Sequence, residues 1–81
     1  MLMDEYKIKE IGVFGSVVRG DQRKTSDIDI LVDFREIPDL LTFVKLANEL
    51  EDALRRKVDL VHKPAIRAEL REHILQEVIY V

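Results

Sequence analysis

A glycine-serine turn and two closely spaced aspartates are the residues of this chain best suited to chemistry. Gly15 and Ser16 follow an apolar run, and ten residues separate Ser16 from Asp27, the first aspartate of the pair Asp27 and Asp29. A turn from a strand into a serine-capped helix exposes backbone N–H groups, which bind phosphate well. Carboxylate oxygens bind a divalent cation. The two features together indicate chemistry on a nucleoside triphosphate.

The two aspartates occupy alternate positions of an expected strand and therefore project from the same face. Their Cα atoms are expected about 6.8 Å apart, so that two carboxylate oxygens can converge on one cation. Without a cation, such like charges repel one another. Asp27 and Asp29 therefore predict a Mg²⁺ site. Asp59 joins them if its own strand neighbours theirs, as a third ligand in a two-metal site or as a general base.

Structural explanations compete with each of these assignments. Asp27 and Asp29 are also compatible with a solvated strand end, and Asp59 with a plain surface position. Arg19 fits an ion pair with a nearby aspartate as well as a phosphate contact. The basic run 55–57 is typical of a solvated helix end, although it also suits the steering of ATP or of an acidic partner.

The remaining pattern predicts the elements that position these residues. Apolar residues alternate with polar ones through 28–34, which indicates a strand with one apolar and one largely acidic face. Gly12 marks either a weak point of a first strand or a close approach by another group. The predicted order is strand 10–14, strand 28–34, helix 39–56, strand 58–61 and a helix from Pro64, with 79–81 finishing that helix or adding a strand. This order predicts an α/β (α+β) fold, a small mixed three- to four-stranded sheet packed with helices.

Helical spacing also predicts which side chains are buried. In the helix 39–56, the predicted buried stripe is Leu40, Phe43, Val44, Ala47, Leu50 and Leu54, which leaves Leu41 and Leu46 outside it. In the last helix, the residues predicted to face inward are Ile66, Leu70, Ile74 and Val78.

Size and composition set further limits. Eighty-one residues predict a single domain spanning 1–81. The net charge of -3 argues against direct nucleic-acid binding, and the absence of cysteine removes disulfides and thiolate metal sites. No apolar run is long enough for a membrane span. We therefore expect a cytoplasmic protein, and the off-stripe leucines make a homo-oligomer a reasonable expectation.

The combined motif resembles the nucleotidyltransferase superfamily of DNA polymerase beta, and its local sequence resembles that of the minimal, antitoxin-type nucleotidyltransferases. The matching run is Gly-Ser-x-x-Arg-Gly, five residues, then Ser-Asp-Ile-Asp-Ile-Leu-Val, with Asp59 in a later strand. This resemblance implies nucleotide binding by Gly15, Ser16 and Arg19. It implies catalytic, Mg²⁺-binding roles for Asp27, Asp29 and Asp59, with two Mg²⁺ ions and ATP as substrate.

The resemblance also implies a function. Such proteins are similar to partners of HEPN-domain ribonuclease toxins, in which AMP passes from ATP to a tyrosine hydroxyl of the toxin. We therefore expect a protein adenylyltransferase that forms a heteromeric complex with such a toxin. The alternative is a non-catalytic antitoxin that masks its partner. A third reading, an enzyme acting on a tRNA end or an antibiotic hydroxyl, is opposed by the acidic charge and the lack of a substrate domain.

Overall fold

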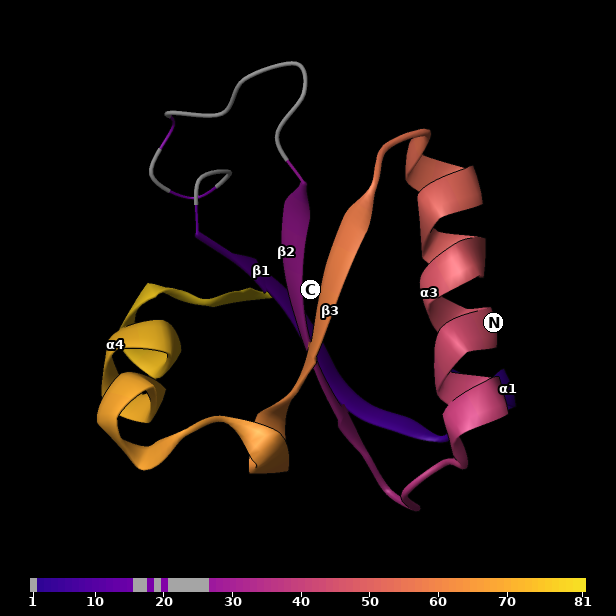
Figure 1. The fold of residues 1–81 in the computed structure, drawn as a ribbon, viewed down its shortest axis with the longest axis horizontal. Helices are drawn as coiled ribbons and strands as arrows, with labels where there is room; N and C mark the ends of the chain where they lie inside the picture. Colours follow the sequence, from indigo (N-terminus) through magenta and orange to yellow (C-terminus); the bar gives the residue numbers. More distant parts are fainter. Residues whose placement is uncertain (1, 16–17, 19, 21–26) are drawn as a thin grey trace.

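The protein folds as a four-stranded sheet with helices against both of its faces (Figure 1). It was analysed as a computed structural model that describes residues 2–15, 18, 20 and 27–81. In chain order the elements are α1 (Leu2–Glu5), β1 (Ile8–Phe14), β2 (Ile28–Phe34), α3 (Leu40–Leu54), β3 (Val58–His62), the 3₁₀ turn η1 (Lys63–Ala65), α4 (Ala68–Glu77) and β4 (Ile79–Tyr80).

The sheet is mixed, with the strand order β3-β2-β1-β4. β1 runs antiparallel to both β2 and β4, whereas β2 and β3 are parallel because α3 carries the chain back to the start of the sheet. The mixed four-stranded sheet with helices confirms the predicted fold class. The end of the chain adds a short strand, which was one of the two outcomes left open by the sequence.

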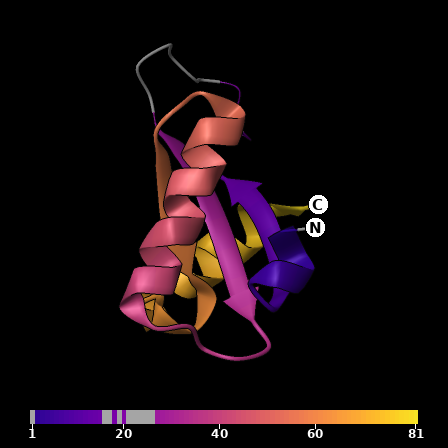
Figure 2. The same ribbon diagram turned by 90° about the vertical axis from the view of Figure 1, so that its right-hand side faces the viewer.

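β2 lies inside the sheet and is apolar on both faces. Ile30, Val32 and Phe34 point towards α3 and form the larger core cluster; Figure 2 shows α3 lying across this face. Leu31 points the other way and packs with Phe14 and Ile66 in a smaller cluster beneath α4. The face that the sequence predicted to be largely acidic is therefore partly an apolar core, with its acids towards the ends of β2.

α3 begins where the sequence predicts, at an aspartate cap. The Asp39 carboxylate accepts a hydrogen bond from the Thr42 backbone N–H at 2.7 Å, which satisfies one of the free donors of the first turn. Hydrogen bonds from the Thr42 side chain and backbone hold the pKa of the Asp39 carboxyl below its usual value. The helix ends at Arg55, which adopts a left-handed conformation (φ 55°).

The predicted buried stripe of α3 was correct only in its middle, where Phe43 packs against the core and Leu50 is buried. Leu46, which was placed outside the stripe, is completely buried and lies with Leu50 against the sheet. Leu40 and Val44, which were placed inside it, are exposed. The helix carries apolar residues around more than one face, so that spacing alone does not decide which face meets the sheet.

The segment before β4 also differs from the prediction. Pro64 lies in η1 rather than at the start of a long helix, and α4 begins only at Ala68. Ile66 is buried just before α4, whereas Leu70 is half exposed. Within the part of the chain that the structure describes, no helix has both the length and the apolar character needed to cross a membrane.

Gly12 marks a close approach between strands rather than a weak point. A Cβ built on Gly12 would lie 2.7 Å from the Ile79 carbonyl oxygen and 2.9 Å from Val78 Cγ2. Gly12 and Tyr80 are register partners in the antiparallel pair of β1 and β4. The absence of a side chain at Gly12 therefore lets the end of α4 turn closely into β4.

Candidate nucleotide and metal site

The parallel pairing of β2 and β3 brings two of the predicted acids together. Asp29 and Asp59 are register partners, as are Ile28 and Val58 one residue earlier. Directly opposite residues of neighbouring strands share a face, and the strands lie about 4.8 Å apart. The strand adjacency on which the placement of Asp59 depended is thus confirmed. The pair lies on the α4 face, near the edge of the sheet where β2 and β3 begin.

The third acid, Asp27, directly precedes β2 and is exposed. It stands two residues before Asp29, which is half-buried, while Asp59 is exposed. No group of three or more histidine, aspartate or glutamate side chains is assembled into a metal site within the described ranges 2–15, 18, 20 and 27–81. The carboxylate pair nevertheless fits Mg²⁺, which prefers oxygen ligands and takes one or two carboxylates with the rest from water and substrate phosphates.

Gly15 connects the predicted phosphate turn to the carboxylate pair. β1 ends at Phe14, which is the register partner of Asp29 in β2, so the next residue lies beside the Asp29 side chain. Gly15 is buried and has φ 74°, a conformation that side chains disfavour. A Cβ on Gly15 would lie 3.0 Å from Asp29 Cγ and would overlap the carboxylate oxygen Oδ2. The bare backbone of Gly15 is therefore packed against the Asp29 carboxylate.

The turn after Gly15 is described only in part. The Gly15 carbonyl accepts a hydrogen bond of 3.1 Å from the Val18 N–H, as expected where the chain turns sharply after the strand. Ser16 and Arg19, which the sequence assigned to nucleotide binding, lie outside the described residues. Their assignments stay predictions.

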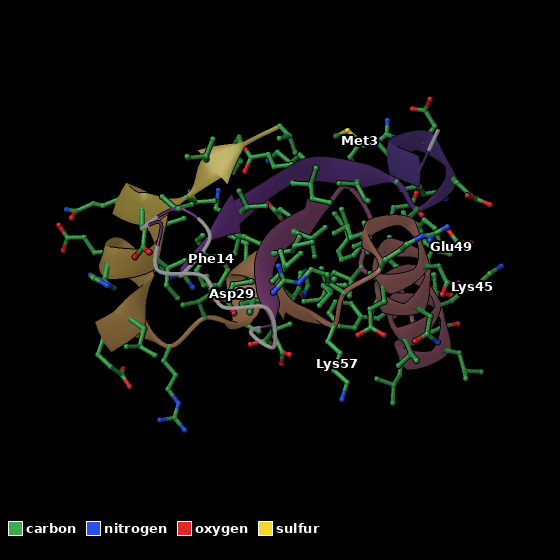
Figure 3. All side chains as sticks on the ribbon, turned by 90° about the horizontal axis from the view of Figure 1, so that it is seen from above. Met3, Phe14, Asp29, Lys45, Glu49 and Lys57 are labelled. Atoms are coloured by element: carbon green, nitrogen blue, oxygen red, sulfur yellow. The ribbon has the colours of Figure 1, made fainter. Side chains whose placement is uncertain are left out.

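The carboxylate pair borders the smaller apolar cluster. Figure 3 views the molecule from this end and shows Phe14 and Asp29 side by side, with Lys57 at the edge formed by β3. Phe14 and Leu31 are buried in that cluster against α4. An apolar floor strengthens the interaction of a carboxylate with a cation, because fewer water molecules screen it.

Two hydrogen bonds that sequence reasoning did not foresee fix the starts of the strands that carry the acids. The Ile28 N–H donates to the Lys57 carbonyl at 2.9 Å, which ties the start of β2 to the entry of β3. The Glu51 carboxylate accepts from the Val58 N–H at 3.0 Å. Both bonds lie one or two residues from the Asp29–Asp59 pair and hold its register. The sequence carries no signal for a helix glutamate in this role.

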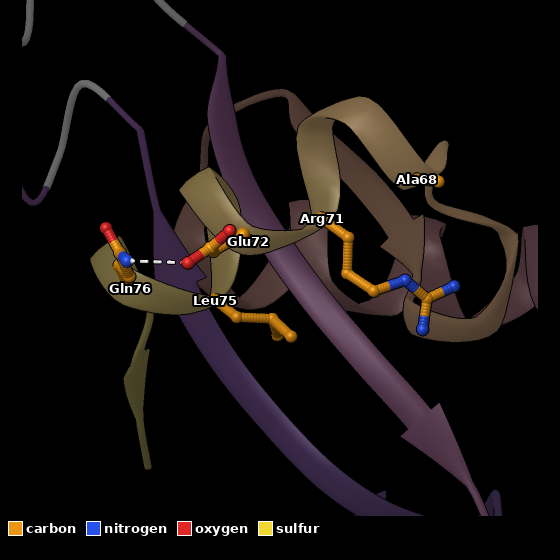
Figure 4. Close-up of a pocket in the computed structure, with 5 residues that line it drawn as sticks. All are labelled: Ala68, Arg71, Glu72, Leu75 and Gln76. Carbon is orange, nitrogen blue, oxygen red and sulfur yellow. Dashed lines mark hydrogen bonds between the residues drawn. The ribbon is translucent and has the colours of Figure 1, made fainter.

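Grooves elsewhere on the molecule are lined by other residues. One groove of about 440 Å³ runs along α4 and is lined by Ala68, Arg71, Glu72, Leu75 and Gln76 (Figure 4). The Gln76 amide donates to the Glu72 carboxylate at 3.4 Å across this helix face, and the Arg71 guanidinium donates to the Ile66 carbonyl at 3.3 Å. Arg71 is thus engaged in holding the segment that leads into α4.

Comparisons with known proteins agree on one family. The family model described as polymerase beta, nucleotidyltransferase matches residues 1–81. A protein adenylyltransferase MntA of Thermococcus cleftensis is 49% identical over 80 residues, which cover 99% of this chain and 81% of the relative.

Two solved toxin–antitoxin complexes contain a similar chain. One, a toxin–antitoxin with AMP-PNP, matches with a TM-score of 0.82 and 31% identity over 98% of this chain. The other, a tri-AMPylated Shewanella oneidensis HEPN toxin with its MNT antitoxin, matches with a TM-score of 0.68 and 28% identity over 91% of this chain. This chain spans 65% and 56% of the length of the two matched chains.

Proposed function

The chain belongs to the polymerase beta family of nucleotidyltransferases, and on that basis we propose that it transfers AMP from ATP to a tyrosine hydroxyl of a HEPN-domain toxin. The transfer would neutralise the toxin, which makes this protein an antitoxin. Three similarities support the proposal: a relative that is a protein adenylyltransferase, a complex containing an ATP analogue, and a complex with an AMPylated HEPN toxin. ATP and a ribonuclease partner also accord with the cytoplasmic location expected from the sequence.

The observation that carries the proposal is the register pairing of Asp29 with Asp59, with the Gly15 backbone against the Asp29 carboxylate. Asp29 and Asp59, with Asp27 beside them, would hold Mg²⁺. When bound, the ion would supply positive charge that neutralises the phosphate oxygens. Gly15 would present its backbone N–H to the triphosphate, together with the predicted contacts of Ser16 and Arg19.

The reaction that these residues would support is an in-line displacement. The acceptor hydroxyl oxygen forms a bond to the α-phosphorus of ATP, and the bond from that phosphorus to the bridging oxygen of pyrophosphate breaks. The hydroxyl proton passes to a carboxylate, for which Asp59 is the better placed because it is exposed to an incoming acceptor while Asp29 is half-buried. Pyrophosphate leaves with its electron pair.

A masking antitoxin without catalysis is the second candidate. It is favoured by a group of exposed aliphatic side chains at the start of α3, which suits contact with a partner protein and needs no chemistry. The two candidates differ in what a toxin-neutralisation assay reports. A masking protein neutralises equally well when Asp29 and Asp59 are both replaced by asparagine, whereas a transferase does not.

The direct test is incubation of this protein with a HEPN-domain toxin, ATP and Mg²⁺, followed by intact mass spectrometry. The proposal predicts the addition of whole AMP units to the HEPN protein by the wild type, and none by Asp29→Asn or Asp59→Asn. Asp33→Asn is the matched control, because Asp33 lies in β2 on the same face as Asp29 but pairs with Glu10 at the other end. Transfer at the wild-type rate by the Asp29→Asn variant would refute the proposal.

A further inference from the structure

The start of α3 carries an exposed aliphatic stripe that the fold does not use. It consists of Ile37, Leu40, Leu41 and Val44, which are 79%, 77%, 81% and 46% exposed. Leu40, Leu41 and Val44 lie on one side of the start of α3, and Ile37 belongs to the segment that leads into the helix. Soluble proteins rarely leave such a contiguous apolar surface open unless another molecule covers it.

A groove adjoins this aliphatic stripe. It measures about 340 Å³ and is lined by Ile37, Pro38, Asp39, Leu40, Phe43 and His62. The His62 ring meets the Phe34 ring edge-on at 5.3 Å, and its Nε2 atom is buried without a hydrogen-bond partner among the described residues. A buried polar atom that lacks a partner costs free energy. The groove therefore has a mostly apolar lining with one carboxylate, that of Asp39, and the His62 nitrogen is buried next to it, a composition suited to an apolar side chain.

The size of the surface indicates what covers it. The four side chains amount to roughly 400–500 Å² of apolar area, the size of a functional patch. A stable interface needs about 800 Å² from each partner. A symmetric pair of this chain, stripe against stripe, would therefore supply little more than half of the required area. A larger protein that extends past the stripe and the groove onto the surrounding surface would reach it.

We propose that the aliphatic stripe and its groove form the docking surface for the HEPN-domain partner, an inference that rests on the proposed function. A helix of the partner would cross the two exposed turns of α3, and one of its side chains would enter the groove beside His62. The stripe lies at the Phe34 end of β2, about 17 Å along the strand from Asp29. A partner docked on the stripe leaves the Asp29–Asp59 pair uncovered (Figure 1). The surface that binds the partner is therefore distinct from the site that transfers AMP to its tyrosine.

The test measures binding of the HEPN protein to the full chain by calorimetry. The double variant Leu40→Lys, Leu41→Lys is expected to weaken binding roughly 30-fold or more, because charges replace central apolar contacts. Leu54→Lys is the matched control, since Leu54 is a 44% exposed leucine at the far end of the same helix; its binding is expected to stay within about threefold of the wild type. Binding of AMP-PNP by each free variant distinguishes a docking defect from a folding defect.

Each outcome decides the question. Weak HEPN binding by the double variant, with AMP-PNP binding retained and the Leu54 control normal, supports the docking surface. Unchanged HEPN binding by the double variant overturns the docking surface. It is also overturned if the wild type is a dimer and the double variant is a monomer that still binds the HEPN protein. If the wild type transfers AMP normally in that case, the proposed function stands and only the docking surface is lost. If the wild type neither binds the HEPN protein nor transfers AMP to it, both the docking surface and the proposed function are refuted.

Discussion

Replacing Gly15 by alanine is expected to disable the site far more than it destabilises the fold. Gly15 has φ 74°, and a residue with a Cβ in this left-handed region costs roughly 1–2 kcal/mol. For a domain of this size, that loss lowers the melting temperature by roughly 5–15 °C. The added Cβ would also overlap Asp29 Oδ2 and lie 3.0 Å from Asp29 Cγ, so that the carboxylate has to move. A displacement of about 1 Å in a reacting constellation costs on the order of 100-fold in rate.

Gly20 provides the matched control for this substitution. It also has a positive φ, 77°, but a Cβ built on it meets no atom of the described residues within 4 Å. Gly20→Ala therefore carries the backbone penalty without the steric one. AMP transfer to the HEPN protein should fall about 100-fold in Gly15→Ala and only slightly in Gly20→Ala, at a temperature where thermal unfolding shows both variants folded. Equal rates in the two variants would refute the contact between Gly15 and Asp29 as a determinant of the site.

Three further predictions concern the fold that positions the site. Gly12→Ala should lower stability by roughly 1–3 kcal/mol, because its Cβ meets backbone at the turn into β4; an unchanged melting temperature would contradict this. Leu46→Ala should cost roughly 2–5 kcal/mol in chemical denaturation, whereas the exposed Leu41→Ala should change stability by less than about 0.5 kcal/mol, and the reverse order would contradict the burial of Leu46 against the sheet. The hydrogen bond from Lys63 lowers the pKa of the Glu10 carboxyl from its usual 4.5. The ion pair of Glu10 with Lys63 therefore stabilises the fold above pH 4.5, and this stabilisation disappears as the pH falls through the lowered pKa. Urea unfolding should therefore separate the wild type from Glu10→Gln at pH 7, and the gap should narrow as the pH falls below 4.5; a gap that widens in acid would contradict the ion pair.

The candidate site could be predicted from the sequence to a large extent because its signals are local. Strand alternation places Asp27 and Asp29 on one face, and a glycine at the end of a strand predicts a turn. To predict that Asp59 lies beside Asp29, one has to know the parallel register of β2 and β3. No feature of the sequence indicates that register. The contact between Gly15 and the Asp29 carboxylate likewise depends on the pairing of β1 with β2.

The orientation of α3 illustrates why burial was harder to predict. Leu40, Val44 and Leu46 all fit an apolar helix face by spacing, but only one face can meet a sheet. The sheet contacts select the face that contains Leu46 and leave the other two exposed. An apolar residue that serves a partner surface looks the same in a sequence as one that serves the core. Two of the mispredicted residues, Leu40 and Val44, therefore belong to the proposed docking surface.

A crystal structure of this protein with Mg²⁺ and AMP-PNP tests the central claim most directly. The account predicts a cation about 2.0–2.1 Å from oxygens of both Asp29 and Asp59, with the triphosphate against the backbone at Gly15. A cation bound to the nucleotide without either carboxylate, or a nucleotide seated elsewhere on the molecule, would contradict it.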